Sequence, residues 1–367
     1  MSSDQESQPA DQPAISVTAE YPIPDLLNWA FDVRWQDAQN VILAAGQKGV
    51  FTVSSDSRTK ALSRIVAGRG EPGGWWLSSH LGVSPDLLVV SSAGLSYAWA
   101  PKASLELREG DFQSDALDSI VDVDLLGKDL LILGGWRGDQ GAYAPDGSIA
   151  WLLELGGEST VRRPVFYSRS GPGTPSMGAC GGLALGAARF MRDGAFVLVP
   201  GVEDGVFWYD AEGQLLRTWE SREFGLRDEC AAAQRTKERI RADPVARNRW
   251  HNQRILVDEV LPLTTGFGLV LRSVEDGVAS WRLARAHRDG RIDWFDLPFT
   301  GGSWSYLKGD VRDHRAVFLI VEHSASLDPP ATRPRLIFAD LHLPELEVER
   351  KAQPAARPTF ESEPASN

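Results

Sequence analysis

Cysteine is almost missing from this chain of 367 residues, which contains only Cys180 and Cys230. Two such widely spaced residues match no metal-binding pattern and cannot form a disulfide framework. Long apolar runs are missing too, since no stretch approaches the ~18 consecutive apolar residues of a membrane-spanning helix. The first residues, Met1–Pro9, include neither the basic nor the apolar segment of a secretory signal. These absences predict a soluble, cytoplasmic protein.

Positive charge is in deficit, with 38 Lys and Arg against 50 Asp and Glu and a formal net charge of −12. An acidic surface repels phosphate groups. The charge therefore disfavours nucleic acid and membrane surfaces as partners. The oligomeric state is left open.

The motifs of several enzyme classes are also absent. The six histidines are scattered and show none of the pairing that zinc sites use. No Gly-x-Ser-x-Gly segment is present, and the glycine-rich stretch 171–182 lacks the Gly-Lys-Ser/Thr ending of a phosphate-binding loop. We therefore expect no metal and no cofactor, and we assign no catalytic residue. A protein without enzymatic activity is favoured, although activity is not excluded.

A short phrase, Val-Glu-Asp-Gly-Val, occurs at 202–206 and again at 274–278. Each copy follows an apolar run and precedes an aromatic one, which is typical of two strands joined by a tight turn. Asp-Gly is a sequence that such hairpins favour. We interpret the phrase as a marker of the repeat rather than as an active site.

Turn glycines set the length of the repeat. Gly49, Gly94 and Gly141 are 45 and 47 residues apart, which is enough for four short strands in each unit. Six such units predict an all-β protein, a β-propeller with six four-stranded blades. Seven blades are the alternative, because 156–185 has room for another strand pair. A helical insertion is expected near 228–245, where Asp228 can cap a helix and Pro244 can stop it.

The strands of unit two are expected to include Leu105–Leu107. Those of unit three are expected to include Gly141–Ala144 and Ile149–Leu155. The N-terminal strand Ile15–Pro22 is expected to complete the last blade, and Glu345–Arg350 competes for that position.

The domain boundaries follow from the repeat. The propeller is expected to span residues 15–351, between disordered tails at 1–14 and 352–367, which are polar and contain proline. Within it, Pro145–Trp151 (PDGSIAW) shows the repeat style. In this style the chain resembles the six-bladed propeller superfamily, with WD-type, quinoprotein-type and NHL-type proteins as its representatives. The resemblance concerns architecture alone, because the Gly-His and Trp-Asp pairs of true WD repeats are lacking. It assigns no role to any residue.

Charged residues on the expected inner strands are candidates for a site in the central channel of a propeller. Converging carboxylates could bind Ca²⁺ or act as an acid/base pair. The alternative is that opposite charges pair with each other across the channel. The candidates are Asp32, Arg34, His80, Asp122, Asp124, Arg189, Asp258 and Lys308, together with Glu259 and Asp310.

A basic segment is the second candidate. It reverses the sign of the chain's charge locally and pairs arginine with tryptophan, a combination that is frequent at binding hot spots. Its residues are Arg235, Lys237, Arg239, Arg241, Arg247, Arg249, Trp250 and Arg254. The sequence thus favours a protein-binding scaffold, a subunit or adaptor in a complex, that docks through the basic 228–254 insertion. The alternative is an enzyme of the hydrolase or lyase type, or a protein that binds a small ligand or a metal, and it would use the carboxylates of the central channel.

Overall fold

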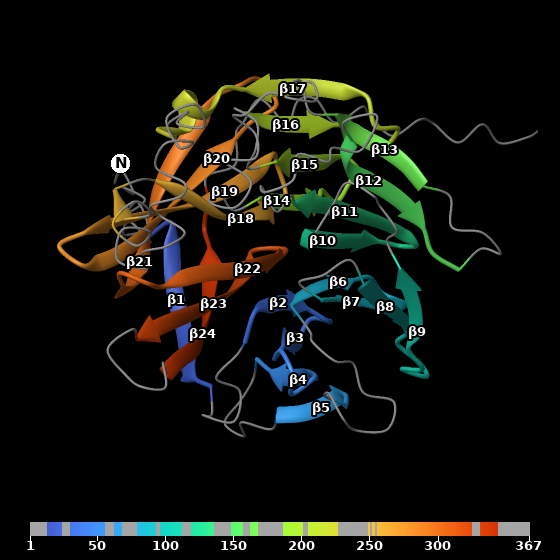
Figure 1. The fold of residues 1–367 in the computed structure, drawn as a ribbon. Helices are drawn as coiled ribbons and strands as arrows, with labels where there is room; N and C mark the ends of the chain where they lie inside the picture. Colours follow the sequence, from blue (N-terminus) through green and yellow to red (C-terminus); the bar gives the residue numbers. More distant parts are fainter. Residues whose placement is uncertain are drawn as a thin grey trace, which may run out of the picture.

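The structure is a computed structural model, and the residues that it describes form an all-β fold. They are 13–23, 30–55, 62–67, 79–92, 96–111, 119–135, 148–156, 162–167, 186–200, 205–226, 249, 252–253, 255–324 and 331–343. Their strands form six antiparallel sheets of four strands each. The sheets are arranged as blades around a common centre (Figure 1). The chain is a six-bladed β-propeller, as the repeat predicts.

Blades 1 to 5 each consist of four consecutive strands, numbered from the inner strand outward. Blade 1 contains β2 (Asp32–Trp35), β3 (Asn40–Ala44), β4 (Val50–Ser54) and β5 (Leu62–Val66). Blade 2 contains β6 (His80–Val83), β7 (Leu87–Ser91), β8 (Ser96–Pro101) and β9 (Arg108–Asp111). Blade 3 contains β10 (Ser119–Leu126), β11 (Asp129–Gly135), β12 (Ser148–Glu154) and β13 (Arg162–Tyr167). Blade 4 contains β14 (Ala187–Phe190), β15 (Phe196–Val199), β16 (Val206–Tyr209) and β17 (Leu215–Trp219). Blade 5 contains β18 (Leu256–Pro262), β19 (Phe267–Glu275), β20 (Val278–Ala286) and β21 (Ile292–Gly302).

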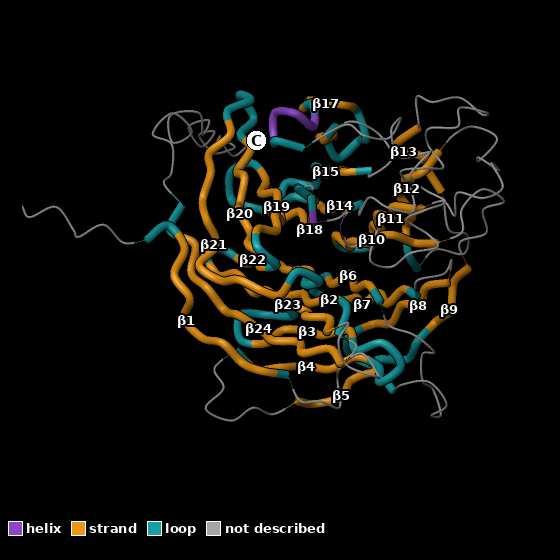
Figure 2. The backbone as a smooth tube through the Cα atoms, turned by 60° about the vertical axis from the view of Figure 1, so that its left-hand side comes forward, coloured by secondary structure: helices purple, strands orange, loops and turns teal. Residues whose placement is uncertain are grey.

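Blade 6 is built from both ends of the described chain. Its order is β22 (Tyr306–Arg312), β23 (Arg315–Ser324), β24 (Ala331–Leu341) and then β1 (Ile15–Pro22) on the outside. β1 runs antiparallel to β24, with Ile15 opposite Leu341 and Pro22 opposite Arg335. Figure 2 shows the two strands side by side. The expected closure by the N-terminal strand is confirmed, and Glu345–Arg350 lies outside the described residues.

The core lies between neighbouring blades because each sheet is covered on both faces. The second strands are buried along almost their whole length: β7 (LLVVS) and β15 (FVLV) are buried throughout. Strands that are apolar on both faces are expected where sheets are packed on both sides. The apolar clusters join residues of adjacent blades, as where the ring of Phe318 of blade 6 packs against that of Phe299 of blade 5, with centroids 5.2 Å apart. The six inner strands contact each other in sequence, and β22 contacts β2 to close the ring.

The second copy of the repeated phrase is the hairpin between β19 and β20. Asp276 and Gly277 both have positive φ, 49° and 81°, and Glu275 pairs with Val278 on either side of them. Two successive residues with positive φ are the signature of a type I′ turn, which explains why Asp-Gly stands here. Residues 202–204 of the first copy lie outside the described residues.

Two outer strands differ from expectation. In blade 2 the fourth strand is Arg108–Asp111 and not Leu105–Leu107; Leu105 follows a turn and has φ of 55°. In blade 3 the segment Ile149–Leu155, expected as the last strand of its unit, corresponds to the third strand, β12, and Arg162–Tyr167 forms the fourth. The outer strands are polar or mixed (REGD, RRPVFY), so hydrophobicity alone did not reveal them. Gly141–Ala144 lies outside the described residues.

The helical insertion expected near 228–245 also lies outside the described residues, so that part of the prediction finds no support. In the described part of the chain, the single helix with assigned bounds is a 3₁₀ helix at Ser221–Phe224, which ends at Gly225 in the left-handed conformation. At the far end of the insertion, the N–H of Gln253 donates to the carbonyl of Arg249. No helix of the described residues has the length and apolar character needed to cross a membrane.

Candidate functional site

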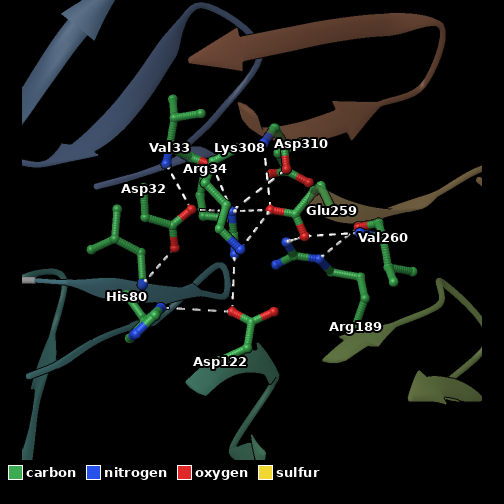
Figure 3. Close-up of polar contacts among 12 residues, drawn as sticks. Asp32, Val33, Arg34, His80, Asp122, Arg189, Glu259, Val260, Lys308 and Asp310 are labelled. Atoms are coloured by element: carbon green, nitrogen blue, oxygen red, sulfur yellow. Dashed lines mark hydrogen bonds and ion pairs between the residues drawn. The ribbon is translucent and has the colours of Figure 1, made fainter. Parts of the chain in front are cut away.

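The inner strands place the charged channel candidates together around the propeller axis. Figure 3 shows charged side chains from the inner strand of every blade converging, with Arg34 in the middle. Asp32, Asp122 and Glu259 are completely buried, and Arg34 and Arg189 are 2% and 1% exposed. His80 and Lys308 are slightly more open, with side chains 16% and 14% exposed. Much of the buried charge of the described residues thus lies at this place.

Arg34 is the centre of an ion-pair network. Its Nη1 donates to Oδ1 of Asp32, two residues earlier on the same strand. The same nitrogen is 3.7 Å from Oε2 of Glu259 in blade 5, and Nη2 is 3.8 Å from Oδ1 of Asp122 in blade 3. One arginine therefore contacts carboxylates of three blades.

Glu259 is the second centre. Its Oε1 accepts a hydrogen bond from Nη2 of Arg189 at 2.6 Å, and its Oε2 is 3.7 Å from Nζ of Lys308. Arg189 also lies 3.5 Å from Asp124 of the preceding blade. The charged candidates pair with each other across the channel.

Most of the charged channel side chains also form a hydrogen bond with the main chain of the next blade. Three carboxylates accept the N–H of a residue on the neighbouring inner strand: Asp32 from Leu81 at 2.8 Å, Asp122 from Ala188 at 3.0 Å and Asp258 from Leu307 at 3.0 Å. They stand in blades 1, 3 and 5 and bind blades 2, 4 and 6. Buried carboxylates thus link alternate pairs of blades.

A second set of links lies further along the strands. Asp124 accepts the N–H of Phe190 at 2.8 Å, and Asp310 accepts the N–H of Trp35 at 2.9 Å. Between blades 4 and 5 the side chain is the donor and the main chain the acceptor: Nε of Arg189 donates to the carbonyl of Val260 at 3.1 Å. These bonds satisfy buried main-chain groups that the sheets leave unpaired.

One junction differs from the others. Between the described residues of β6 and β10, in blades 2 and 3, no hydrogen bond is found. The side chains that meet there are His80 and Asp122, with Nδ1 and Oδ1 4.0 Å apart. Nδ1 of His80 is buried and has no hydrogen-bond partner. The backbones also come close here, because a Cβ on Gly82 would lie 2.9 Å from that of Leu125.

Burial and pairing move the pKa values in opposite directions. Burial raises the pKa of Asp32 and of Asp124 to about 6, although nearby arginines partly oppose it. Burial also acts on Asp122 and Glu259, but their cationic neighbours, led by Lys308 for Asp122 and by Arg189 for Glu259, outweigh it and lower the pKa of both. Burial lowers the pKa of His80 to about 4, so its imidazole is neutral at pH 7. The local environment thus gives chemically similar carboxyl groups different pKa values.

Two members of the channel were not predicted from the sequence. Tyr306 donates from its hydroxyl to the carbonyl of Ala30 at 3.0 Å and thereby links blade 6 to blade 1. The alternation Tyr306, Lys308, Asp310 along one inner strand could have revealed it, because residues two apart share a face. Arg272 lies 3.5 Å from Asp258 but belongs to the second strand of its blade, where no sequence signal points to the channel.

The basic segment is not placed by the structure, apart from Arg249. Arg249 is exposed. The other residues predicted to bind a partner are Arg235, Lys237, Arg239, Arg241, Arg247, Trp250 and Arg254, and they lie outside the described residues.

The fold and the channel define a six-bladed β-propeller whose inner strands are linked by buried carboxylates and arginines. No family model matches the chain, and no curated protein matches it either. Among solved structures, a member of the DUF4221 family from Bacteroides vulgatus is 11% identical, with a TM-score of 0.52 over 89% of this chain and 97% of that one. The WD40 repeats of RRP9 are 14% identical, with a TM-score of 0.49 over 88% of this chain and 98% of that one. A β-propeller domain from Myceliophteria thermophila is 10% identical, with a TM-score of 0.45 over 89% of this chain and 99% of that one. At such identities, similarity concerns the fold alone.

Proposed function

We propose that this protein is a non-enzymatic scaffold of the cytoplasm, a subunit or adaptor that presents its propeller to a protein partner. The observation that carries the proposal is that the channel carboxylates form hydrogen bonds with the main chain of neighbouring blades. Asp32, Asp122 and Asp258 each accept the main-chain N–H of the next blade. Groups engaged in this way hold the ring together and are poorly available for acid/base catalysis, which requires a side chain within reach of a substrate proton. The hydrolase or lyase alternative therefore has less support.

The basic segment from 228 to 254 is the proposed docking element. Its seven cationic residues stand in a chain with a formal net charge of −12, so they offer a local site for an acidic protein surface. A helix in this insertion would present them together. Arg249, which is exposed, is in keeping with this role.

The test is affinity purification from the native host with mass spectrometry, using wild-type protein and the double variant Arg239→Glu/Arg241→Glu. We expect the double variant to lose a partner that the wild type retains, and the partner to dissociate at high salt, because exposed charges are screened. The matched control reverses two exposed lysines elsewhere, Lys48→Glu/Lys128→Glu, and should retain the partner. Equal recovery by both double variants would overturn the docking role.

A further inference from the structure

The junction between blades 2 and 3 brings three possible metal ligands together. The ligand atoms of Asp32, His80 and Asp122 all lie within 4.8 Å of one another. Each comes from a different blade: Asp32 from β2, His80 from β6 and Asp122 from β10. Both aspartates are completely buried. In Figure 3 the carboxylate of Asp122 and the imidazole of His80 face each other.

The charge around these residues is unbalanced. Five carboxylates, those of Asp32, Asp122, Asp124, Glu259 and Asp310, face three cations, Arg34, Arg189 and Lys308. When all are ionised, two negative charges remain without a counter-charge. Uncompensated charge inside a protein is costly. One divalent cation would neutralise it.

The histidine gives a second, independent indication of a bound cation. Nδ1 of His80 is buried without a hydrogen-bond partner, and a buried unpaired nitrogen is unfavourable. This nitrogen points toward Asp122 at the junction where no hydrogen bond joins the described residues of β6 and β10. We propose that Asp32, His80 and Asp122 bind one divalent transition-metal ion, of which Zn²⁺ is the representative, and that this ion joins blades 1, 2 and 3 at the channel.

The ligand set selects the metal. Imidazole nitrogen favours Zn²⁺ and its first-row neighbours, whereas Ca²⁺ and Mg²⁺ prefer oxygen alone. With metal–ligand bonds near 2.1 Å, the ligand atoms of a tetrahedral site are about 3.4 Å apart, so these side chains need to approach by about 1 Å. Water takes the remaining coordination position. The role is structural and goes beyond the proposed scaffold function.

Arg34 competes for the same carboxylates, since it bonds Asp32 and lies 3.8 Å from Asp122. It also has an alternative partner. Its Nη1 is 3.7 Å from Glu259, and its Nε and Nη2 have no hydrogen-bond partner. A small movement toward Glu259 would shorten that ion pair and free the carboxylates for the metal.

The experiment uses the full chain, stripped with a chelator and titrated with ZnCl₂ by calorimetry, with thermal unfolding in parallel. Wild type should bind one Zn²⁺ per chain, and its Tm should rise by roughly 5 °C at a hundredfold excess over Kd. His80→Ala, which removes no hydrogen bond, should fold but bind at least ~10-fold more weakly. The control His314→Ala removes an exposed histidine elsewhere and should behave as wild type.

Additional variants and metal ions complete the experiment. If His80→Ala does not fold, His80→Gln replaces it with the same expectation. Mg²⁺ and Ca²⁺ should give no thermal shift. Substoichiometric Zn²⁺ binding by wild type would overturn the proposal, as would His80→Ala binding as tightly as wild type. Loss of binding in His314→Ala alone would also overturn it, because it would identify an adventitious surface site.

Discussion

The carboxylate of Asp32, on the inner strand of blade 1, accepts the main-chain N–H of Leu81, on the inner strand of blade 2, at 2.8 Å. The same carboxylate binds Arg34, which reaches toward blades 3 and 5. A propeller is held together by contacts between its blades, and here those contacts are polar at the axis and apolar further out. Buried charge therefore contributes to the closure of the ring.

Asp258 provides a direct test of these polar links. Its Oδ2 accepts hydrogen bonds from Nε1 of Trp281 at 2.8 Å and from the N–H of Leu307 at 3.0 Å. Its Oδ1 is 3.5 Å from Arg272. Asp258→Ala leaves two buried donors and one buried cation unpaired, so the free energy of unfolding should fall by about 3–5 kcal/mol. Denaturant unfolding measures the loss. Asp258→Asn, which keeps an acceptor oxygen, should lose clearly less, and equal losses would show that the hydrogen bonds do not carry the effect.

Closure by β1 is tested by truncation. Removing residues 1–22 takes away the outer strand of blade 6 together with buried Ile15 and leaves the edge of β24 unpaired. Each lost main-chain hydrogen bond contributes about 1 kcal/mol, so Tm should fall strongly or cooperative unfolding should disappear. Thermal unfolding followed by circular dichroism is the measurement. Removing only residues 1–12, which precede the strand, should leave Tm unchanged. A similar Tm for both truncations would mean that β1 is not needed for closure.

The pH dependence of stability follows from Asp310. Burial raises the pKa of Asp310 above its ordinary value of 3.8, and Arg189 and Arg34 only partly oppose the shift. A carboxyl whose pKa is raised in the folded state binds its proton more tightly there than in the unfolded chain. Its contribution to stability is full below the unfolded pKa and is lost as the pH rises through the folded one. Asp310→Asn cannot titrate, so its stability relative to wild type should increase as the pH rises from 4 upward.

The measurement for Asp310 is denaturant unfolding of both proteins in chelator between about pH 4 and pH 8. The asparagine retains an oxygen that can accept the N–H of Trp35, so any cost of the altered hydrogen bonds should be similar at every pH. Parallel pH profiles for the two proteins would contradict the raised pKa.

Much of the architecture could be predicted from local sequence. The spacing of the turn glycines indicated blades of four strands, and Asp276-Gly277 forms the tight turn that this dipeptide favours. The outer strands were harder, because an edge strand such as Arg108–Asp111 needs no apolar residues to pair with its neighbour. The polar character of the channel was visible in the charges of the inner strands, but the side-chain partners were not.

By itself, the sequence determined the all-β class and the repeat of four strands per blade, because these depend on hydrophobic pattern and turn chemistry over a few residues. It favoured six blades and closure by the N-terminal strand, but it left an alternative to each that the tertiary structure decided. The tertiary structure alone decided which group each buried charge would meet. Asp32 accepts the main-chain N–H of Leu81, 49 residues away, and Asp122 accepts that of Ala188, 66 residues away. Asp310 accepts the N–H of Trp35, 275 residues away. Such partners depend on the relative height of neighbouring inner strands, which only the closure of the whole ring sets. The same closure brings Asp32, His80 and Asp122 within 4.8 Å, although no spacing along the chain suggests a metal site.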